Sequence, residues 1–430
     1  MMKLRILATG LAALLAAPAA AQEAVPVIAV PPLATPDDKE TSAGSTLSLA
    51  WQATQLIASD LQSAAGIMAL SPDQKDYYSY PEVTAPTHSR WRAKGAKALL
   101  TGFVQARPDG RLAVGCYVYD VEKGRELGRT GFVVAAGEWR RAAHKCSGLA
   151  YKSLTGAPGV FDTRIAYVAR SGFGAAQVSR IAVMDGDGTN HNYVTGGDSM
   201  VLTPRLSPNG ERLAYVSFSG GKPNVRVIEL ASNEQRPLVP GDAISFAPRY
   251  SPDGNRIVFS MTQNGNTDIY VVAAAGGFPQ RLTSSPGIDT AASFSPDGTR
   301  ILFESDRSGS QQLYLMDANG ADQRRISFAG GWYAAPEWSP DGERVAFVRR
   351  GSDGLRIGVM KVDGSDQQIL SSGPRDEGPS WAASSRELLF QREEGLGRTG
   401  IYRVALGGAQ PRKVTVPQDG ADPDWSGARD

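Results

Sequence analysis

The sequence predicts an exported protein in which an N-terminal α/β domain is followed by an all-β propeller of six blades. Three observations predict this fold. A tetrapeptide recurs at a fixed interval, short strand patterns surround each copy, and the first third of the chain shows no such period. Repeated units of four short strands are typical of propeller blades. The length of 430 residues also favours two domains over one core.

Residues 1–21 have the composition of a secretory signal peptide. Lys3 and Arg5 form a basic start, and residues 6–16 are apolar but too few to span a bilayer. A retained membrane anchor fits less well, because the apolar run stops at Pro18 and small residues suited to cleavage follow. No later apolar run reaches spanning length, so we expect a soluble exported protein.

Residues 22–158 show no repeat and predict the mixed α/β domain. The pattern indicates a strand over 25–30 and a helix over 45–64, with Ser45 as its N-cap. Three more strands and a last amphipathic helix are predicted over 97–104, 111–120, 129–135 and 138–154. A segment rich in Gly and Pro ends this helix and leads into the propeller, predicted over residues 159–430.

The tetrapeptide Ser-Pro-Asp/Asn-Gly organises the rest of the chain. Its four regular copies, 44 residues apart, begin at Ser207, Ser251, Ser295 and Ser339. Degenerate copies follow at Trp381 and Trp425. Pro presets φ, Asp or Asn accepts local backbone hydrogen bonds, and Gly takes the positive φ that closes a hairpin. Each copy therefore joins the first strand of a blade to the second.

The blade count closes only at six. Residues 164–168 and 181–184 predict a second and a third strand with no first strand before them. Residues 422–425 predict a first strand with nothing after it. We expect these segments to complete one blade from both ends of the chain, which removes open sheet edges from the ring.

Cys116 and Cys146 are the two cysteines of the chain. Both fall on inward faces of predicted elements, and an exported protein meets an oxidising compartment. A disulfide and two separate buried thiols both remain open at this point. The scattered His88, His144 and His191 complete no metal-binding pattern, so we expect no metal site.

The bulk charge and the short motifs exclude several functions. Lys and Arg number 45 against 44 Asp and Glu, which gives no electrostatic case for nucleic acid or anionic lipid. The glycine-rich segment 395–400 fits a dinucleotide pattern, but no helix follows it. Segment 185–188 lacks the remaining ligands of a calcium loop. No His accompanies a plausible nucleophile, so we expect neither an enzyme nor a cofactor.

The predicted domain junction resembles that of a known family. Residues 141–146, the Leu154-Thr155-Gly156 hinge and residues 161–168 are similar to the TolB family, the periplasmic propellers of the Tol-Pal system. Residues 57–61 and 100–102 add support, and the resemblance covers nearly the whole chain after the leader. The family usually has a longer segment ahead of its first strand than the 22–24 found here.

The resemblance implies a location, partners and a role. TolB-like proteins are periplasmic, bind the lipoprotein Pal at one propeller face, and contact TolA through the mature N-terminus. Their system maintains outer-membrane integrity and helps the envelope constrict at division. It therefore implies a scaffold, which we expect to be a monomer that reaches membranes only through its partners.

The stretches before the Ser-Pro turns predict the binding site. Loops and inner strands meet at the channel mouth of a propeller, and these stretches vary between repeats while the turns do not. Pure scaffold would repeat, so the variation favours binding. The expected aromatic anchors are Phe246, Trp332 and Tyr333. The expected polar contacts are Asp289, Thr290, Arg375, Asp376, Glu377 and Asp422.

Two alternatives concern polysaccharides. A propeller that cleaves an extracellular polysaccharide would bring His, Asp and Arg together in the channel, and these stretches offer acids and Arg375 but no His. A propeller that only binds a polysaccharide would show exposed aromatic residues at the mouth, which Phe246, Trp332 and Tyr333 leave open.

Overall fold

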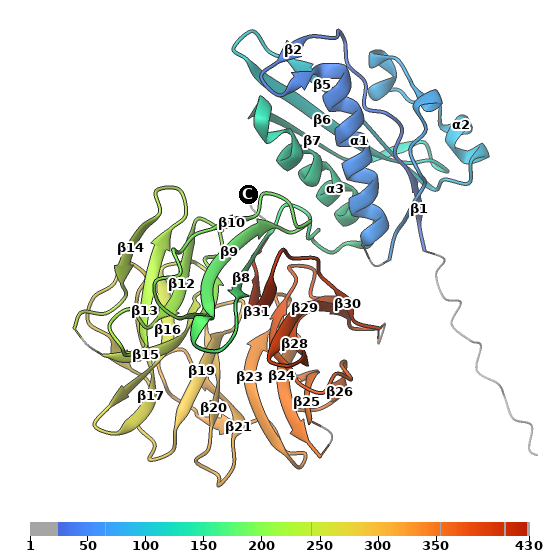
Figure 1. Ribbon diagram of the computed structural model, residues 1–430. Helices are drawn as coiled ribbons and strands as arrows, with labels where there is room; N and C mark the ends of the chain where they lie inside the picture. The colour runs from blue at the N-terminus through green and yellow to red at the C-terminus, as the bar shows by residue number, and fades with distance from the viewer. Residues whose placement is uncertain (1–24, 65, 242, 353, 408–409, 428–430) are drawn as a thin grey trace, which may run out of the picture.

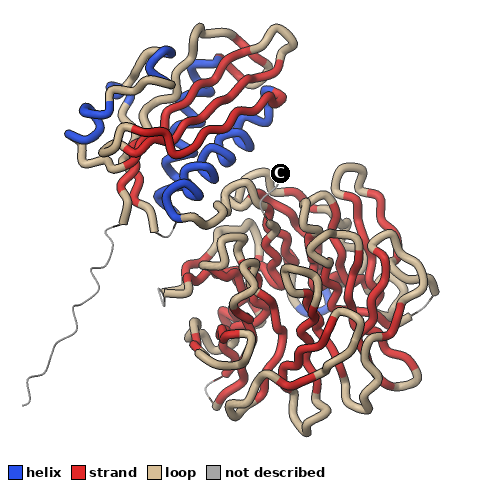
Figure 2. Tube along the Cα trace, turned by 180° about the vertical axis from the view of Figure 1, so that it is seen from behind, coloured by secondary structure: helices blue, strands red, loops and turns tan. Residues whose placement is uncertain are grey.

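The computed structural model describes residues 25–64, 66–241, 243–352, 354–407 and 410–427. It has the predicted architecture of an N-terminal α/β domain followed by a six-bladed β-propeller (Figure 1). The helices gather in the N-terminal domain, and the propeller consists mainly of strands (Figure 2). The predicted signal peptide lies outside the described residues. Within them, no helix has both the length and the apolar composition needed to cross a membrane.

The N-terminal domain is built on a five-stranded sheet with the order β4-β1-β5-β6-β7. Its strands are β1 (Val27–Ala29), β4 (Met68–Ala69), β5 (Ala98–Ala106), β6 (Arg111–Asp120) and β7 (Arg125–Ala135). The helices α1 (Thr46–Ser63) and α3 (Trp139–Thr155) pack together on one face of this sheet. On the other face, Trp91 of α2 (His88–Ala93) packs against β5 and β6. A hairpin of β2 (Glu40–Thr41) and β3 (Gly44–Ser45) precedes α1.

Both long helices have the ends that their sequences predict. The Ser45 side chain accepts the N–H of Ser48 at 3.2 Å and caps α1. Gly156 takes the left-handed conformation after α3, with φ of 75°, and its N–H donates to the Lys152 carbonyl. Buried apolar residues of both helices form one core with the sheet.

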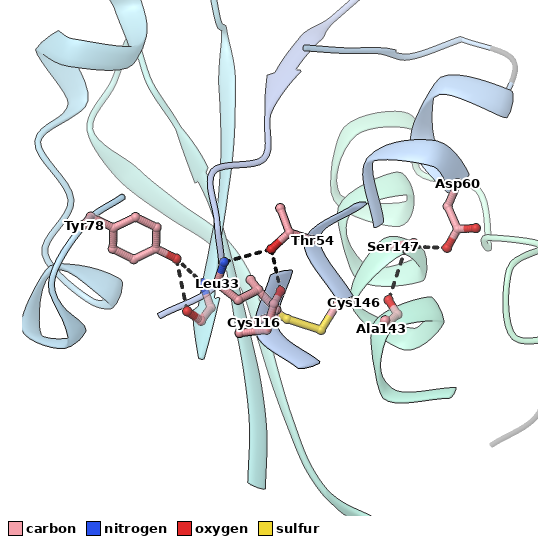
Figure 3. The surroundings of a disulfide bond; sticks show 10 residues. Leu33, Thr54, Asp60, Tyr78, Cys116, Ala143, Cys146 and Ser147 are labelled. Carbon is pink, nitrogen blue, oxygen red and sulfur yellow. Dashed lines mark hydrogen bonds between the residues drawn. A yellow bond between two sulfur atoms is a disulfide. The ribbon is translucent and has the colours of Figure 1, made fainter. Parts of the chain in front are cut away.

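A disulfide bond joins Cys116 on β6 to Cys146 on α3 (Figure 3), with the two Cα atoms 5.8 Å apart. The sequence left open whether these cysteines pair. In the structure both are fully buried in the core between helix and sheet. The bond therefore fixes α3 on the sheet from within the core.

Each blade is an antiparallel sheet of four strands. Blade 1 contains β31 (Asp419–Trp425), β8 (Arg164–Ser171), β9 (Val178–Asp185) and β10 (Asn192–Tyr193). Blades 2 and 3 contain β11 (Val201–Leu206), β12 (Arg212–Ser217), β13 (Asn224–Glu229) and β14 (Glu234–Pro237), then β15 (Ile244–Tyr250), β16 (Arg256–Gln263), β17 (Asn266–Ala273) and β18 (Gln280–Arg281). Blades 4 and 5 contain β19 (Asp289–Phe294), β20 (Arg300–Ser305), β21 (Gln312–Asp317) and β22 (Arg324–Arg325), then β23 (Trp332–Trp338), β24 (Arg344–Gly351), β25 (Gly354–Lys361) and β26 (Gln368–Ile369). Blade 6 contains β27 (Asp376–Trp381), β28 (Glu387–Gly395), β29 (Arg398–Ala405) and β30 (Arg412–Lys413).

Blade 1 closes the ring as predicted. Its inner strand β31 comes from the end of the chain and pairs antiparallel with β8. Arg164 and Ser426 exchange two hydrogen bonds across this junction, at 2.8 and 2.9 Å. The ring is thus closed by backbone pairing between segments far apart in the sequence.

The propeller has two distinct faces. The inner strands end at the Ser-Pro turns, and the face that carries these turns lies beside the N-terminal domain (Figure 1). Here Arg140 of α3 forms an ion pair with Asp187, in the loop between β9 and β10. We call the face that carries the Ser-Pro turns the turn face. We call the opposite face, where the inner strands begin, the mouth face.

A buried histidine joins the two domains. His144 Nδ1 lies 2.8 Å from Asp60 of α1, and His144 Nε2 lies 3.4 Å from Asp187 of the propeller. Ser147 donates to the same Asp60 carboxylate at 2.7 Å. This contact links both long helices of the N-terminal domain to blade 1.

Each inner strand contains a β-bulge at the same repeat position. The residue at each bulge has φ between 45 and 61°; these residues are Thr203, Ala247, Ala291, Ala335, Gly378 and Asp422. All except Ala291 are followed by a proline. A bulge changes which side chains of a strand face a given side. Every second side chain of an inner strand faces the channel on each side of the bulge, but the bulge shifts this alternation by one residue.

Candidate functional site

The inner strands of all six blades line a cavity of about 270 Å³ at the mouth face. Each blade contributes at least one residue, among them Thr203, Ala247, Ala291, Trp332, Glu377 and Asp422. Trp332 is the aromatic side chain in this lining, and its side chain is half-buried. The ring of blades thus creates one concave surface from six short strands.

Three carboxylates line this cavity. Glu304 accepts hydrogen bonds from Thr290 at 2.5 Å and from the Ala335 N–H at 2.8 Å. Burial raises the pKa of Glu304, although these hydrogen bonds oppose the shift. Glu377 accepts from Gln391 at 3.0 Å, and Asp422 accepts from the Thr203 N–H at 3.2 Å. Contacts within and between neighbouring blades therefore hold these three carboxyl groups in place, and Arg205 and Arg249 line the same cavity.

A network of paired charges forms the floor of the cavity. Arg249 contacts Glu337 at 2.7 Å and Asp424 at 3.2 Å, and Arg205 lies 3.8 Å from the same Asp424. Burial raises the pKa of Glu337, and the attraction of Arg249 opposes this shift. Arg205 and Arg249 also line a second cavity of about 330 Å³ on the turn face. The network thus lies between the two cavities.

The same network holds neighbouring blades together. Asp424 accepts the Leu206 N–H at 2.7 Å, and Glu337 accepts the Trp381 N–H at 3.1 Å. Ser380 accepts the Trp425 N–H at 3.0 Å in the same way. A channel side chain of one blade therefore satisfies a backbone donor of the next.

The structure brings part of the predicted site together. Trp332, Glu377 and Asp422 line the cavity, and Thr290 supports its Glu304. Arg375 is exposed at the rim, with its Nε 3.2 Å from Glu377.

Tyr333, Asp289 and Asp376 lie elsewhere, because all three are fully buried. The Tyr333 ring packs against Phe347, with ring centroids 5.3 Å apart, in the core between blades 4 and 5. At this depth Tyr333 cannot be the exposed anchor that the sequence suggested. Its neighbour Trp332 alternates with it and faces the cavity instead.

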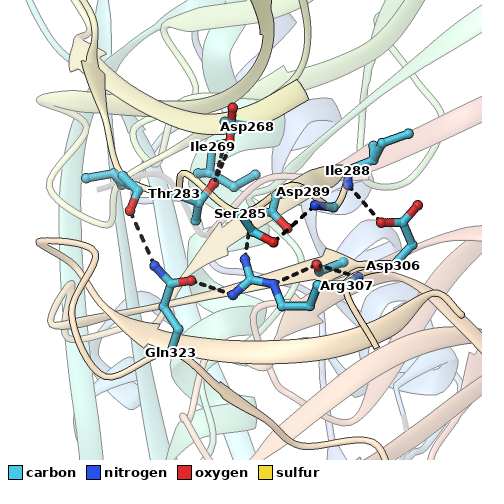
Figure 4. Close-up of polar contacts among 12 residues, drawn as sticks. Asp268, Ile269, Thr283, Ser285, Ile288, Asp289, Asp306, Arg307 and Gln323 are labelled. Atoms are coloured by element: carbon cyan, nitrogen blue, oxygen red, sulfur yellow. Dashed lines mark hydrogen bonds and ion pairs between the residues drawn. The ribbon is translucent and has the colours of Figure 1, made fainter. Parts of the chain in front are cut away.

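The two buried aspartates form ion pairs within their blades. Asp289 contacts Arg307, in the hairpin loop after β20, at 2.7 Å (Figure 4), and Asp376 contacts Arg392 of β28 at 2.7 Å. The first pair connects the inner strand of blade 4 to the loop after its second strand, and the other connects the inner strand of blade 6 to its second strand. These carboxylates are therefore occupied in the scaffold. Phe246 is half-buried, packs on the core between blades 2 and 3, and is not part of the cavity lining.

Sequence reasoning missed the floor residues Arg205, Arg249, Glu337 and Asp424. A signal for them was present at the repeat position directly before the aromatic or leucine residue of each Ser-Pro turn. That position reads Arg205, Arg249, Ser293, Glu337, Ser380 and Asp424 around the ring. Its two positive and two negative charges cancel, as expected for side chains that share one channel.

Exposed apolar side chains stand on loops of the mouth face. Leu396 is 96% exposed and Phe173 is 72% exposed, on hairpin loops of the adjacent blades 6 and 1. Met200 and Ile288 are about half exposed where inner strands begin. Apolar side chains around a concave mouth with polar groups are typical of a surface that contacts another protein.

The fold and the site define a two-domain propeller protein with a free channel mouth opposite its N-terminal domain. Comparison with known families agrees with both parts of this architecture. The family model of the TolB beta propeller domain matches residues 151–429, and that of the TolB amino-terminal domain matches residues 20–127. The chain belongs to the TolB family.

Individual relatives are similar over part of the chain. Tol-Pal system protein TolB of Zymomonas mobilis is 50% identical over 212 residues, covering 49% of this chain and 46% of that protein. Tol-Pal system protein TolB of Rhizorhabdus wittichii is 46% identical over 219 residues, covering 49% of this chain and 50% of that protein. The chain spans about half the length of these curated relatives. The crystal structure of TolB from Acinetobacter baumannii matches with a TM-score of 0.78 and 27% identity, covering 94% of this chain and 97% of that one.

Proposed function

We propose that the protein is a periplasmic, non-catalytic scaffold of the Tol-Pal system that binds the lipoprotein Pal at the mouth face of its propeller. The observation that carries this proposal is the cavity to which every blade contributes, lined by Trp332 and by charged side chains. Exposed apolar loops border it, and the N-terminal domain lies at the other face. The names of the curated relatives support the assignment to the Tol-Pal system.

The wider role follows from this assignment. The protein would support outer-membrane integrity and envelope constriction during cell division. Its N-terminal domain would contact TolA or other Tol proteins, and membrane contact would occur only through partners. The proposal requires no cofactor and a monomeric protein.

Calorimetric titration of the mature protein with the periplasmic domain of its own organism's Pal tests the proposal. We expect saturable binding that the Trp332→Ala, Glu377→Ala double variant weakens by roughly 10-fold or more, because central aromatic contacts dominate interface energies. The matched control is Phe278→Ala, which removes an aromatic side chain that is 94% exposed on a turn-face loop. It should bind Pal normally. No binding by the intact protein would overturn the Tol-Pal proposal.

The polysaccharide alternatives have less support from the cavity. Trp332 lines the cavity, whereas Tyr333 is buried and Phe246 packs on the core. Among the described residues that line it, none is a histidine. The same calorimeter experiment with polysaccharides in place of Pal would detect such binding.

A further inference from the structure

The contact between the two domains is bordered by open clefts. Cavities of about 360 and 570 Å³ adjoin Arg140 near the start of α3, and each is lined by residues of both domains. Among the described residues, Val160 of the linker is the one apolar residue that packs both against the core of the N-terminal domain and against the core between blades 6 and 1. With so little shared apolar core, the polar contacts decide how firmly the domains are joined.

His144 lies at the centre of these polar contacts. Its side chain is 1% exposed, with Nδ1 2.8 Å from Asp60 of α1 and Nε2 3.4 Å from Asp187 of the propeller. Ser147 also donates to Asp60 (Figure 3), and Arg140 also pairs with Asp187. Both carboxylates line the 570 Å³ cleft. The two ring nitrogens therefore face carboxylates that belong to different domains.

The protonation of the imidazole decides how many of these contacts it can make. Protonated His144 carries an N–H on both ring nitrogens, so it attracts both carboxylates. A neutral imidazole has one N–H, and its other nitrogen is an acceptor. Because the contact with Asp60 is the shorter one, the remaining N–H stays on Nδ1, and the lone pair of Nε2 then faces Asp187. Loss of the proton thus turns an attraction between the domains into a repulsion, while the contact within the N-terminal domain persists.

The other charged pairs at this junction hold the domains less firmly. They are Arg140 with Asp187, Arg141 with Asp162, and Arg403 with Glu387. Arg403 also donates to the Ser63 carbonyl at the end of α1. The three arginine side chains are 26 to 35% exposed, so water screens their attraction, whereas His144 is buried.

We propose that His144 is a proton-operated latch: its imidazolium holds the N-terminal domain on blade 1, and its neutral form releases that domain to turn about the linker after Gly156. The helix α3 ends at this glycine, so the linker can bend without unwinding the helix. The two carboxylates hold the pKa of His144 at about 9, so the latch is closed at neutral pH and opens in alkaline solution. It lies on the turn face and does not depend on the mouth face or on Pal.

Spin-label distance measurements on the full mature protein test the latch. The labels go on Gln55→Cys of α1 and Ala231→Cys of the loop between β13 and β14, which are exposed positions in different domains. The two native cysteines are buried in their disulfide and stay unlabelled. We expect one narrow distance distribution at pH 7 and a distribution about twofold wider at pH 10, because the released domain turns about its linker.

Three variants separate His144 from other groups that titrate in alkaline solution. Asp187→Asn should stay narrow at both pH values, because its amide donates to the lone pair of a neutral Nε2. His144→Gln should be wide at both, because an uncharged amide does not attract two carboxylates. The matched control His191→Gln changes a histidine of blade 1 outside the junction and should respond as the wild type does.

Three results would overturn the latch. The first is an equal width at pH 7 and pH 10 in the wild type, and the second is equal widening in Asp187→Asn. The third is a narrow distribution in His144→Gln at pH 7, which needs no alkaline solution. Circular dichroism of each labelled protein checks that both domains remain folded. The Pal titration is read separately, so the failure of this proposal and that of the Pal proposal are distinguishable.

Discussion

At the scale of single residues, Ala291 shows how much backbone strain the propeller tolerates. It has φ of 51° at its bulge, a conformation that costs an L-residue roughly 1–2 kcal/mol relative to the right-handed region. Its N–H donates to Ser260 of blade 3 at 3.2 Å. The strain therefore accompanies a contact between blades, and the same bulge recurs in every inner strand.

Replacing Ala291 by Gly should raise the free energy of unfolding by about 0.5–1 kcal/mol. Gly relieves the left-handed strain, and the greater entropy of its unfolded chain offsets only part of the gain. Urea denaturation measures the change. The matched control is Ala292→Gly, one position later, where the residue is fully buried and φ is not positive. The control should lower stability by about 1 kcal/mol, and an equal loss in both variants would contradict the strain argument.

The bulge also explains which site residues could be predicted from the sequence. Variation between repeats drew attention to the stretches before the turns, and three residues of these stretches, Trp332, Glu377 and Asp422, line the cavity. Within a strand, alternate residues face opposite sides, so Tyr333 points into the core between blades. A bulge changes this alternation at a backbone angle that residue types do not reveal. The floor residue Glu337 lies beyond the bulge, and its signal appears only when the same position is compared in all six repeats.

At the scale of elements, the turn chemistry explains why the strands were predictable. The Ser207 side chain accepts the N–H of Arg212 at 2.9 Å, and the Ser207 N–H donates to the Arg212 carbonyl at 2.8 Å. Ser251, Ser295 and Ser339 make the equivalent contacts in their turns. Local hydrogen bonds thus fix the hairpin register without reference to the rest of the fold. The side-chain partners across blades have no comparable local signal.

The disulfide between β6 and α3 gives a prediction at this scale. It closes a loop with a sequence separation of 30 residues. Replacing both cysteines by Ala should lower the free energy of unfolding of the N-terminal domain by about 3 kcal/mol, because the unfolded chain regains the entropy of the open loop. Thermal unfolding followed by hydrogen exchange would show earlier loss of protection in α3 than in the blades. Equal stability of the variant and the oxidised protein would contradict this prediction.

At the scale of the whole molecule, His144 contacts both domains, and its protonation makes the free energy of unfolding depend on pH. Burial alone would lower its pKa, but the neighbouring carboxylates of Asp187 and Asp60 outweigh burial and raise the pKa of His144 to about 9. An unfolded histidine has a pKa of about 6.5. The stabilisation by protonated His144 is therefore complete below about pH 6.5 and is lost as the pH rises through 9.

We expect the free energy of unfolding to fall by on the order of 3 kcal/mol between pH 6.5 and pH 9.5. Urea denaturation at a series of pH values measures this decline. In a His144→Gln variant the decline over this window should be largely absent, because Gln does not titrate. A His191→Gln variant serves as the control and should retain it. A decline of equal size in wild type and His144→Gln would assign it to other groups.

Ring closure by β31 has a consequence for the order of events during synthesis. A chain that emerges from its N-terminus onward presents β8 and β9 long before Asp419–Trp425 is made. Until then the edge of β8 that faces the channel stays unpaired, and the floor network lacks Asp424. The last strand to appear therefore supplies both the closing pairing and the final charge of the floor. Quality control that recognises open strand edges would see this propeller as unfinished until almost the whole chain has arrived.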